Sequence, residues 1–371
     1  MALRTLSVAN LRNVESVSID LDPIGNLLAG PNGAGKTALL ESVFLLSTGR
    51  SFRSGRPGSL IRHGAESLLV RGTRLDDVSL AIERSRDGQQ RLRLRGEPCE
   101  RLADLARSLP SLALLPDIAE LVFGAPDLRR RALDWGLFHV ERSFNDDAGR
   151  YARCLRQRNA VLRRLAQGEA DTGLGVWTER LAGLGEALSV AREHYLARIR
   201  PRFAAELARL DADLDVRLEY TPGFNAEVGL IDELSQHWDH EIRRATTLYG
   251  PHRADLRIRS DNHAAGSVLS RGQGKMVALA LRLAQVSDLV QQRDIVPILL
   301  VDDIGAELDR DRGERLLEAL TSARSQIIAT TADDVWARDA GARGPLAALS
   351  ERWPVFHVEQ GSVNPVTAGA R

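Results

Sequence analysis

The chain has 371 residues, of which 43% are hydrophobic and 27% charged, and its formal net charge is zero. This composition is typical of a globular protein and excludes disordered, fibrous and membrane-spanning chains. The two cysteines, Cys99 and Cys154, are too few for a disulfide framework or a zinc cluster. Because we also find no signal peptide and no apolar run of about 18 residues, we expect a cytoplasmic protein with two or three lobes.

The N-terminal part of the chain is predicted to consist mostly of strands, followed by helices. Apolar residues alternate along the first strands, at Leu3, Leu6 and Val8 and at Val17, Ile19 and Leu21. Shorter strands are expected at 67–72, 78–84 and 90–95. From about Asp117 to Ile242 the spacing of apolar residues predicts helices, one of which Pro201 is expected to kink or break.

The C-terminal part returns to an alternation of strands and helices. Strands are expected at 214–220, 255–259 and 295–301, and a long helix at 273–291. The tail from Gln360 to Arg371 is expected to be loosely ordered. These elements predict an α/β fold in which a helical insert separates two sheet-forming ends.

A phosphate-binding loop is the clearest motif in the chain. Residues 30–37 read GPNGAGKT, which matches the pattern G-x-x-x-x-G-K-T. The glycines let backbone amides turn toward phosphate oxygens, Lys36 reaches the β and γ phosphates, and the Thr37 hydroxyl can bind magnesium. The residues expected to hold the nucleotide are therefore Gly30, Pro31, Asn32, Gly33, Ala34, Gly35, Lys36 and Thr37.

An acidic pair follows an apolar strand late in the chain. Residues 298–303 read ILLVDD, and a strand buried on both faces ends where ligands of α/β sheets bind. We expect Asp302 to hold magnesium and Asp303 to position or deprotonate the attacking water. The alternative is that the two carboxylates only cap the next helix.

A second glycine motif lies directly before the long helix. Residues 269–275 read LSRGQGK, and a serine hydroxyl with the amides of a helix N-terminus can bind an anion. Taken alone, the motif favours the simpler interpretation that Ser270 caps the helix. The order along the chain of the phosphate loop, this motif and the acidic strand instead favours a role in binding phosphate.

The three motifs in this order resemble the ABC-type ATPase heads of the SMC and break-repair class, and most specifically the RecF family. Further segments resemble that family in the expected order, from SVANLRNVESVSIDL through LLPDIAELVFGAPDLRRRALDWGLFHVE to LSRGQGKMVALALRLAQ. The resemblance covers nearly all of the chain except the last dozen residues. It implies an α/β ABC-type P-loop ATPase head, with mixed sheets around a central helix, plus a largely helical second lobe. The corresponding division is 1–115, the N-terminal part of the ATPase lobe; 116–245, a helical lobe; and 246–371, a C-terminal part that contains the signature motif at 269–275 and the acidic strand and returns to the first lobe.

The resemblance also implies a nucleotide site that two copies of the chain share. Ser270, Gly272 and Gln273 of one protomer would face the γ-phosphate bound to the other, and Asp309 would couple the two sites. Arg12 and Asn13 match a turn that lies near the nucleotide in such heads, although an exposed turn is the alternative. ATP and Mg²⁺ are the implied cofactors, and a weak, switch-like ATPase with Lys36 and Asp303 as catalytic residues is the implied enzyme.

Three departures from the wider class concern the signature motif, residues 269–275, and the hydrolytic site. Arg271 stands where that class has glycine, and Asp303 where transport ATPases place glutamate. Thr330 and Thr331 occupy the strand end where those ATPases carry a switch histidine. The last two departures favour slow turnover.

DNA is the partner that the resemblance implies. Residues 148–164 carry six arginines and no acid, and we expect Arg150, Arg153 and Arg156 to contact the phosphate backbone, although a solvated helix face is the alternative. The resemblance further implies single-strand, gapped or junction DNA, the partners RecR and RecO, recombinase loading, and a link to the SOS response.

Two other functions compete with an ATP-switched DNA-binding protein. A transport ATPase subunit is disfavoured because the phosphate loop and the signature motif lie far apart and the switch histidine is missing. A structural clamp that binds ATP without hydrolysing it stays open, and in that case Asp303 would be dispensable.

Overall fold

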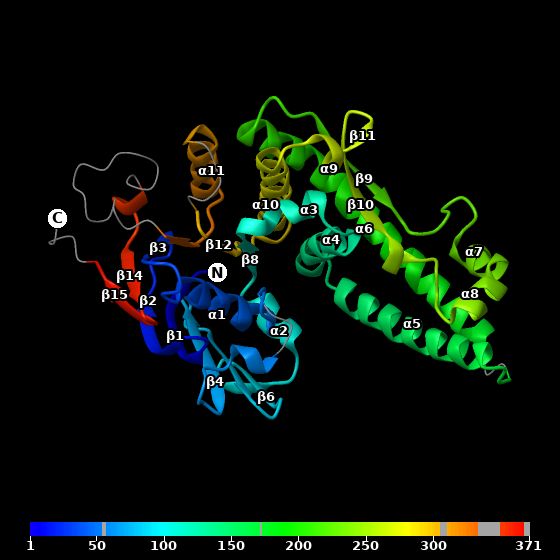
Figure 1. The fold of residues 1–371 in the computed structure, drawn as a ribbon, viewed down its shortest axis with the longest axis horizontal. Helices are drawn as coiled ribbons and strands as arrows, with labels where there is room; N and C mark the ends of the chain where they lie inside the picture. The colour runs from blue at the N-terminus through cyan, green and yellow to red at the C-terminus, as the bar shows by residue number, and fades with distance from the viewer. Residues whose placement is uncertain (54–56, 171–172, 305–309, 333–348, 367–371) are drawn as a thin grey trace. The chain divides into compact units, whose positions relative to one another are not determined.

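The computed structural model describes residues 1–53, 57–170, 173–304, 310–332 and 349–366. The chain forms two compact units, one of Met1–Ile118 with Arg293–Arg371 and the other of Ala119–Gln292 (Figure 1). The predicted division differs from this, because it ended the helical lobe at residue 245. Residues 246–292 instead pack in the helical unit, where strand β10 (Asp255–Ser260) pairs with β9 (Val216–Thr221).

The first sheet of unit 1 is antiparallel, with the strand order β2-β1-β4-β5-β6-β7. The predicted alternation is present, since Leu6 and Val8 are buried along β1 and Val17 and Ile19 along β2. Successive side chains of a strand point to opposite faces, so one face of this sheet packs on the core. The strands are β1 (Leu3–Leu11), β2 (Val14–Asp20), β4 (Ser67–Arg74), β5 (Ser79–Ser85), β6 (Gln90–Leu94) and β7 (Glu97–Cys99).

The second sheet of unit 1 has the order β15-β14-β3-β13-β12-β8, and all its pairs are parallel except β14 with β15. Its central strands are continuous apolar runs, as expected for a sheet buried on both faces. The tail that was expected to be loosely ordered contributes β15 as the second strand of a hairpin. The strands are β3 (Gly25–Ala29), β8 (Ser111–Leu114), β12 (Ile298–Val301), β13 (Ile327–Thr331), β14 (Val355–Glu359) and β15 (Ser362–Pro365).

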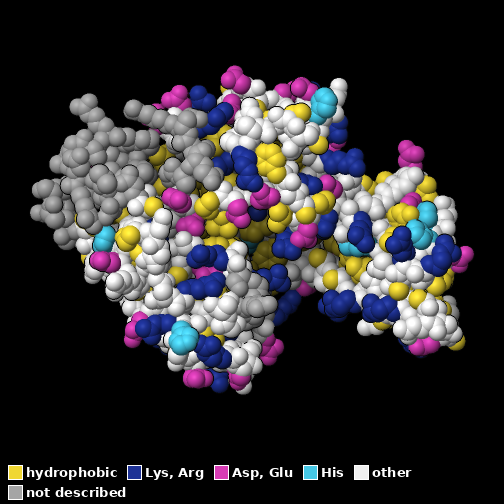
Figure 2. Space-filling model, in the orientation of Figure 1, with side chains coloured by type: hydrophobic (Ala, Val, Ile, Leu, Met, Phe, Trp, Pro, Cys, Tyr) yellow, Lys and Arg dark blue, Asp and Glu magenta, His cyan; other side chains and the backbone are white. Residues whose placement is uncertain are grey.

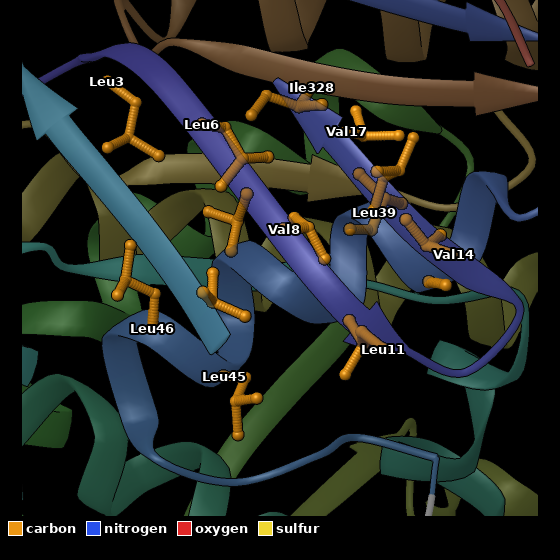
Figure 3. Packing of buried hydrophobic residues seen from close by; sticks show 14 of the residues in the cluster. Leu3, Leu6, Val8, Leu11, Val14, Val17, Leu39, Leu45, Leu46 and Ile328 are labelled. Carbon is orange, nitrogen blue, oxygen red and sulfur yellow. The ribbon is translucent and has the colours of Figure 1, made fainter. Parts of the chain in front are cut away.

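Helix α1 (Lys36–Thr48) lies in the core of unit 1 and is buried on almost all sides. Its Leu39, Leu45 and Leu46 belong to one apolar cluster with residues of both sheets, among them Val8 of β1 and Ile328 of β13 (Figure 3). A helix that is apolar all round requires such a position. Unit 1 also contains helices α2 (Leu102–Ser108) and α11 (Arg310–Ser322) and the short 3-10 helix η1 (Pro57–Leu60).

Unit 2 is largely helical and carries one small antiparallel sheet of β9, β10 and β11 (His263–Ala264). Within the described ranges of the chain, no helix combines the length and apolarity that crossing a membrane requires. The helices are α3 (Glu120–Phe123), α4 (Pro126–Val140), α5 (Phe144–Ala166), α6 (Leu174–Leu210), α7 (Leu230–Gln236), α8 (Trp238–Arg244), α9 (Ala265–Val268) and α10 (Arg271–Arg293), with η3 (Pro251–Arg253).

Helix α6 runs through Pro201 without ending, so of the two expected effects the break is wrong, and the kink stays a prediction. Pro201 is exposed, which leaves its ring on the solvent side of the helix. The buried face continues on both sides of it, with Tyr195 and Ile199 before and Phe203 and Leu207 after. Burial of this face over the whole helix therefore outweighs the hydrogen bond that proline removes.

A buried ion pair joins α5 to α8 in unit 2. Arg158 and Glu241 are both fully buried, and their side chains approach to 2.6 Å. Arg158 also donates to the hydroxyls of Thr178 at 2.9 Å and Thr247 at 2.8 Å. One member of the predicted arginine stripe is therefore a structural residue that no partner molecule can reach.

Replacing Glu241 by Ala should destabilise unit 2 by about 3–5 kcal/mol, because it leaves the Arg158 charge buried without its partner. Urea unfolding followed by tryptophan fluorescence would measure this, since Trp177 and Trp238 lie against the neighbouring apolar cluster. The control is Glu193→Ala, which breaks a half-exposed ion pair with Arg200 and should cost less than about 1 kcal/mol. Equal, small losses for both variants would contradict the structural role of Glu241.

Candidate nucleotide-binding site

The phosphate loop connects β3 to α1 and contains glycines that no other residue can replace. At Gly30 a Cβ atom would lie 2.2 Å from the carbonyl oxygen of Val358 on β14. Gly35 has φ of 115° and directly precedes the helix. Residues with a side chain rarely adopt this backbone conformation. The first backbone amides of a helix have no hydrogen-bond acceptor inside the helix. The loop therefore presents a helix N-terminus to an anion, as the sequence motif predicts.

Lys36 is folded back over the loop and is only 7% exposed. Its ammonium donates to the carbonyl oxygens of Gly30 at 2.6 Å and Pro31 at 2.9 Å. These contacts hold the charge at the loop. An ammonium has three donors and can exchange such bonds for phosphate oxygens.

Thr37 and Asp302 come together although they are far apart in the sequence. The Thr37 hydroxyl donates to the two carboxylate oxygens of Asp302, at 3.1 and 3.2 Å. A hydroxyl and a carboxylate are the oxygen ligands that Mg²⁺ prefers, together with phosphate and water. This donor set fits the predicted magnesium site.

Thr330, at the end of β13, joins the two acidic residues. Its hydroxyl donates to Asp302 at 2.7 Å and accepts the backbone N–H of Asp303 at 2.8 Å. Asp303 adopts a left-handed conformation with φ of 53°, which is unusual for a residue with a side chain. From the sequence, Thr330 was only a departure at a histidine position, and these contacts were not predicted. The only signal was a pair of hydroxyl residues at the end of an apolar strand.

Arg12 and Asn13, in the turn between β1 and β2, both bond to the region of the phosphate loop. Arg12 forms a two-bonded ion pair with Glu41, a buried residue of α1, at 2.9 Å for each bond. The hydrogen bond to Glu41 raises the pKa of Arg12 above its ordinary value. Asn13 donates from its side chain to the carbonyl oxygen of Gly33 at 3.0 Å. Their predicted role at the nucleotide stays a prediction.

The C-terminal hairpin β14–β15 also supports the loop, a contact that was not predicted from the sequence. The N–H of Gly361, in the turn of the hairpin, donates to the carbonyl oxygen of Ala34 at 2.8 Å. A Cβ atom at Gly361 would lie 2.4 Å from the carbonyl oxygen of Asn13. The hairpin turn, Asn13 and the phosphate loop are thus in mutual contact.

The signature motif lies in unit 2, at the start of α10, whereas the phosphate loop lies in unit 1. Ser270 and Gln273 form a reciprocal cap: the Ser270 hydroxyl accepts the N–H of Gln273 at 3.3 Å, and the Gln273 side chain accepts the N–H of Ser270 at 2.9 Å. Gly272 is half-buried, and Arg271 forms an exposed ion pair with Glu120 at 3.0 Å. Asp309 lies outside the described residues. The predicted roles of these residues toward a second copy stay predictions.

Comparisons with known proteins agree on one family. A family model described as RecF/RecN/SMC N terminal domain matches residues 2–344. DNA replication and repair protein RecF of Acinetobacter baylyi is 35% identical over 370 residues, covering 99% of this chain and 100% of that protein. A solved structure of the recombination mediator protein RecF with ATP, in the RecFOR pathway, matches with a TM-score of 0.85 at 24% identity, covering 99% and 98% of the two chains. An SMC head bound to a domain of ScpA matches with a TM-score of 0.60 at 16% identity, covering 100% and 98%. The predicted head fold is confirmed.

Replacing Gly361 by Ala should weaken ATP binding severalfold, because the new methyl group displaces Asn13 and with it the loop. Titration of the protein with ATP in a calorimeter would measure the change. Gly88→Ala is the matched control, since Gly88 has φ of 89° against 81° for Gly361 but has no atom within 4 Å of an added Cβ. Both variants carry the same backbone strain of about 1 kcal/mol, so equal ATP affinities would rule out the contact with Asn13 as the cause.

Proposed function

The chain belongs to the RecF family, and from this premise we propose that it is an ATP-dependent DNA-binding protein of recombinational repair and replication-fork maintenance. The observation that carries the proposal is the convergence of Lys36, Thr37 and Asp302 at the carboxyl ends of the parallel strands β3, β13 and β12. This is the edge at which α/β proteins bind their ligands. An ATP-bound relative of the same fold supports the choice of nucleotide.

The chain's own groups suit the binding and slow hydrolysis of ATP. The amides of the loop and the Lys36 ammonium would bind the β and γ phosphates, and Thr37 and Asp302 would hold Mg²⁺. When bound, the ion would neutralise charge on the phosphate oxygens. Asp303 would accept a hydrogen bond from the attacking water and orient it. With an aspartate in this role we infer a weak ATPase that acts as a switch.

We further propose that two copies share each nucleotide. Ser270, Gly272 and Gln273 of one protomer would face the γ-phosphate held by Lys36 of the other, and Asp309 would couple the two sites. ATP would then stabilise the homodimer and hydrolysis would release it. RecR and RecO, recombinase loading at single-strand gaps and a link to the SOS response are the partners and roles that we infer from family membership, in the cytoplasm.

The DNA-binding surface that we propose is the exposed face of α5 together with the end of α8. Among the described residues of unit 2, most exposed arginines without a hydrogen bond, ion pair or ring contact lie on these two helices. They are Arg153, Arg156, Arg163, Arg243 and Arg244, with Arg253 and Arg257 outside them. Figure 2 shows Lys and Arg side chains over α5 and α8. Arg150, also expected to bind DNA, lies 3.5 Å from Asp147, which offsets its charge.

Helix α8 is fixed beside α5 by hydrogen bonds as well as by the buried ion pair. Asn159 of α5 accepts the N–H of Thr247 at 2.8 Å and its hydroxyl at 2.7 Å, three residues after Arg244. Arg156 and Arg163 are three positions before and four after Asn159, so they flank it on the helix surface. The arginines of both helices can therefore act on one phosphate backbone, to which each adds affinity without reading sequence.

Ser270→Arg should leave ATP binding by the single protomer intact and prevent ATP-dependent dimerisation, because it places a bulky cation at the proposed interface. Light scattering with ATP and Mg²⁺ would measure the mass, and calorimetry the affinity. Lys36→Met is the companion variant and should lose ATP binding and dimers together. ATP-induced dimers of Ser270→Arg that match the unmodified protein would overturn the shared site.

Replacing Arg243 and Arg244 by Gln should weaken duplex DNA binding and lower the slope of log affinity against log salt by about 2, since each phosphate contact contributes about 0.9. Fluorescence anisotropy over a series of salt concentrations would measure the slope. Arg131→Gln and Arg217→Gln are controls, because these exposed arginines are already paired with Asp127 and Asp215. An unchanged slope would mean that the α8 arginines do not contact DNA phosphates and belong to the ordinary solvated surface.

A further inference from the structure

Thr330 makes contacts that an ordinary buried threonine does not require. Its side chain is 1% exposed, and its hydroxyl bonds to both residues of the acidic pair, Asp302 and Asp303. The hydroxyl has a single proton, which it gives to the Asp302 carboxylate at 2.7 Å. A lone pair of the same oxygen is then available to the N–H of Asp303, as observed.

The two hydrogen bonds of the Thr330 hydroxyl constrain different parts of the acidic pair, a side chain and a backbone segment. The bond to the carboxylate sets the rotation of the Asp302 side chain, whose oxygens also accept the hydroxyl of Thr37 at 3.1 and 3.2 Å. The bond to the amide holds the backbone of Asp303 in its left-handed conformation at φ of 53°. Such a conformation persists only where surrounding contacts determine it. The main-chain N–H groups of Asp302 and Ile304 are held by the carbonyl oxygens of Leu114 at 3.0 Å and Thr330 at 2.9 Å, so the Thr330 hydroxyl is the side-chain group that completes the placement of Asp303.

We propose that Thr330 is a positioning residue of the nucleotide site, which orients Asp302 toward the metal position and Asp303 toward the water that attacks the γ-phosphate. The proposal rests on the proposed function of this site. Thr330 touches neither nucleotide nor reacting atoms in this scheme and acts through the two aspartates. A single hydroxyl thereby couples the binding of the metal–nucleotide complex to the geometry of hydrolysis.

The placement of Thr330 explains why a hydroxyl is suited to this strand end. β13 lies between β3, which leads into the phosphate loop, and β12, which leads into the acidic pair. A side chain at its carboxyl end can reach the acidic pair directly. Valine has nearly the same shape as threonine but offers neither bond, so a valine variant separates the packing role from the positioning role.

The experiment compares Thr330→Val with Thr330→Ser and measures ATP affinity twice, with Mg²⁺ and with EDTA. We expect the ATP affinity of Thr330→Val in Mg²⁺ to be lower than that of the unmodified protein by about 10-fold or more, because a hydrogen bond to a charged group contributes a free energy of that size. The ATP affinity measured in EDTA should be unchanged. Turnover at saturating ATP should fall as well, and the KM for ATP in the presence of Mg²⁺ should rise with the loss of affinity. Thr330→Ser keeps the hydroxyl and should restore both quantities.

Two further variants make the result decisive. Thr178→Val removes an equally buried hydroxyl, in α6 of unit 2, and should not change the Mg²⁺ dependence. In an Asp302→Asn background, Thr330→Val should have little additional effect on Mg²⁺-dependent affinity, because it acts through that carboxylate. If Thr330→Val does not fold, Thr330→Ala replaces it in every measurement.

The outcomes separate this proposal from the proposed function. An unmodified protein whose ATP affinity does not respond to Mg²⁺ would contradict the function itself. An unmodified protein that does respond, with a Thr330→Val variant that responds equally, would overturn the positioning role alone. Equal losses in EDTA and in Mg²⁺ would also overturn it, because they would mean that Thr330 only supports the fold of the loop.

Discussion

The parallel alignment of β3, β13 and β12 is the constraint on which the nucleotide site depends. Ala29 at the end of β3 lies opposite Thr331, and Val301 at the end of β12 lies opposite Ala329. Each strand therefore delivers its next residues to the same edge. A shift of one residue in either register would turn the following side chains to the other face of the sheet. The hydrogen bonds of Asp302 to Thr37 and Thr330 follow from this register.

The apolar core and the site share the same elements, so they cannot vary independently. Helix α1 begins with the phosphate-loop lysine and is otherwise packed between residues of both sheets. The ion pair of Arg12 with Glu41 ties the first hairpin to this helix, and Gly361 ties the last hairpin to the loop. Residues from both ends of the chain thus hold the loop in one conformation, which lowers the cost of organising it when phosphate binds.

The structural features that could be predicted from the sequence depend on local residue patterns. The features that could not be predicted depend on contacts between distant parts of the chain. The phosphate loop, the alternation in β1 and the apolar run of β12 depend on neighbouring residues, so spacing alone indicates them. The contacts of Thr330 and Gly361 depend on which strands pair, and no local pattern records that. The continuation of α6 past Pro201 was not predictable for the same reason, because the burial that stabilises the helix there comes from other elements. The burial of Arg158 likewise depends on Glu241, a residue of another helix.

The cap at Ser270 does not compete with a role at phosphate, although the two were alternatives for the sequence. A serine hydroxyl has two lone pairs and one proton, and the cap uses one lone pair, which accepts the N–H of Gln273. Within the described chain its proton has no bonded acceptor. It can be donated to a phosphate oxygen while the cap stays intact. The cap then fixes the hydroxyl at an exposed helix N-terminus. In the proposed shared site, the hydroxyl would therefore be oriented before the phosphate held by a second protomer binds there.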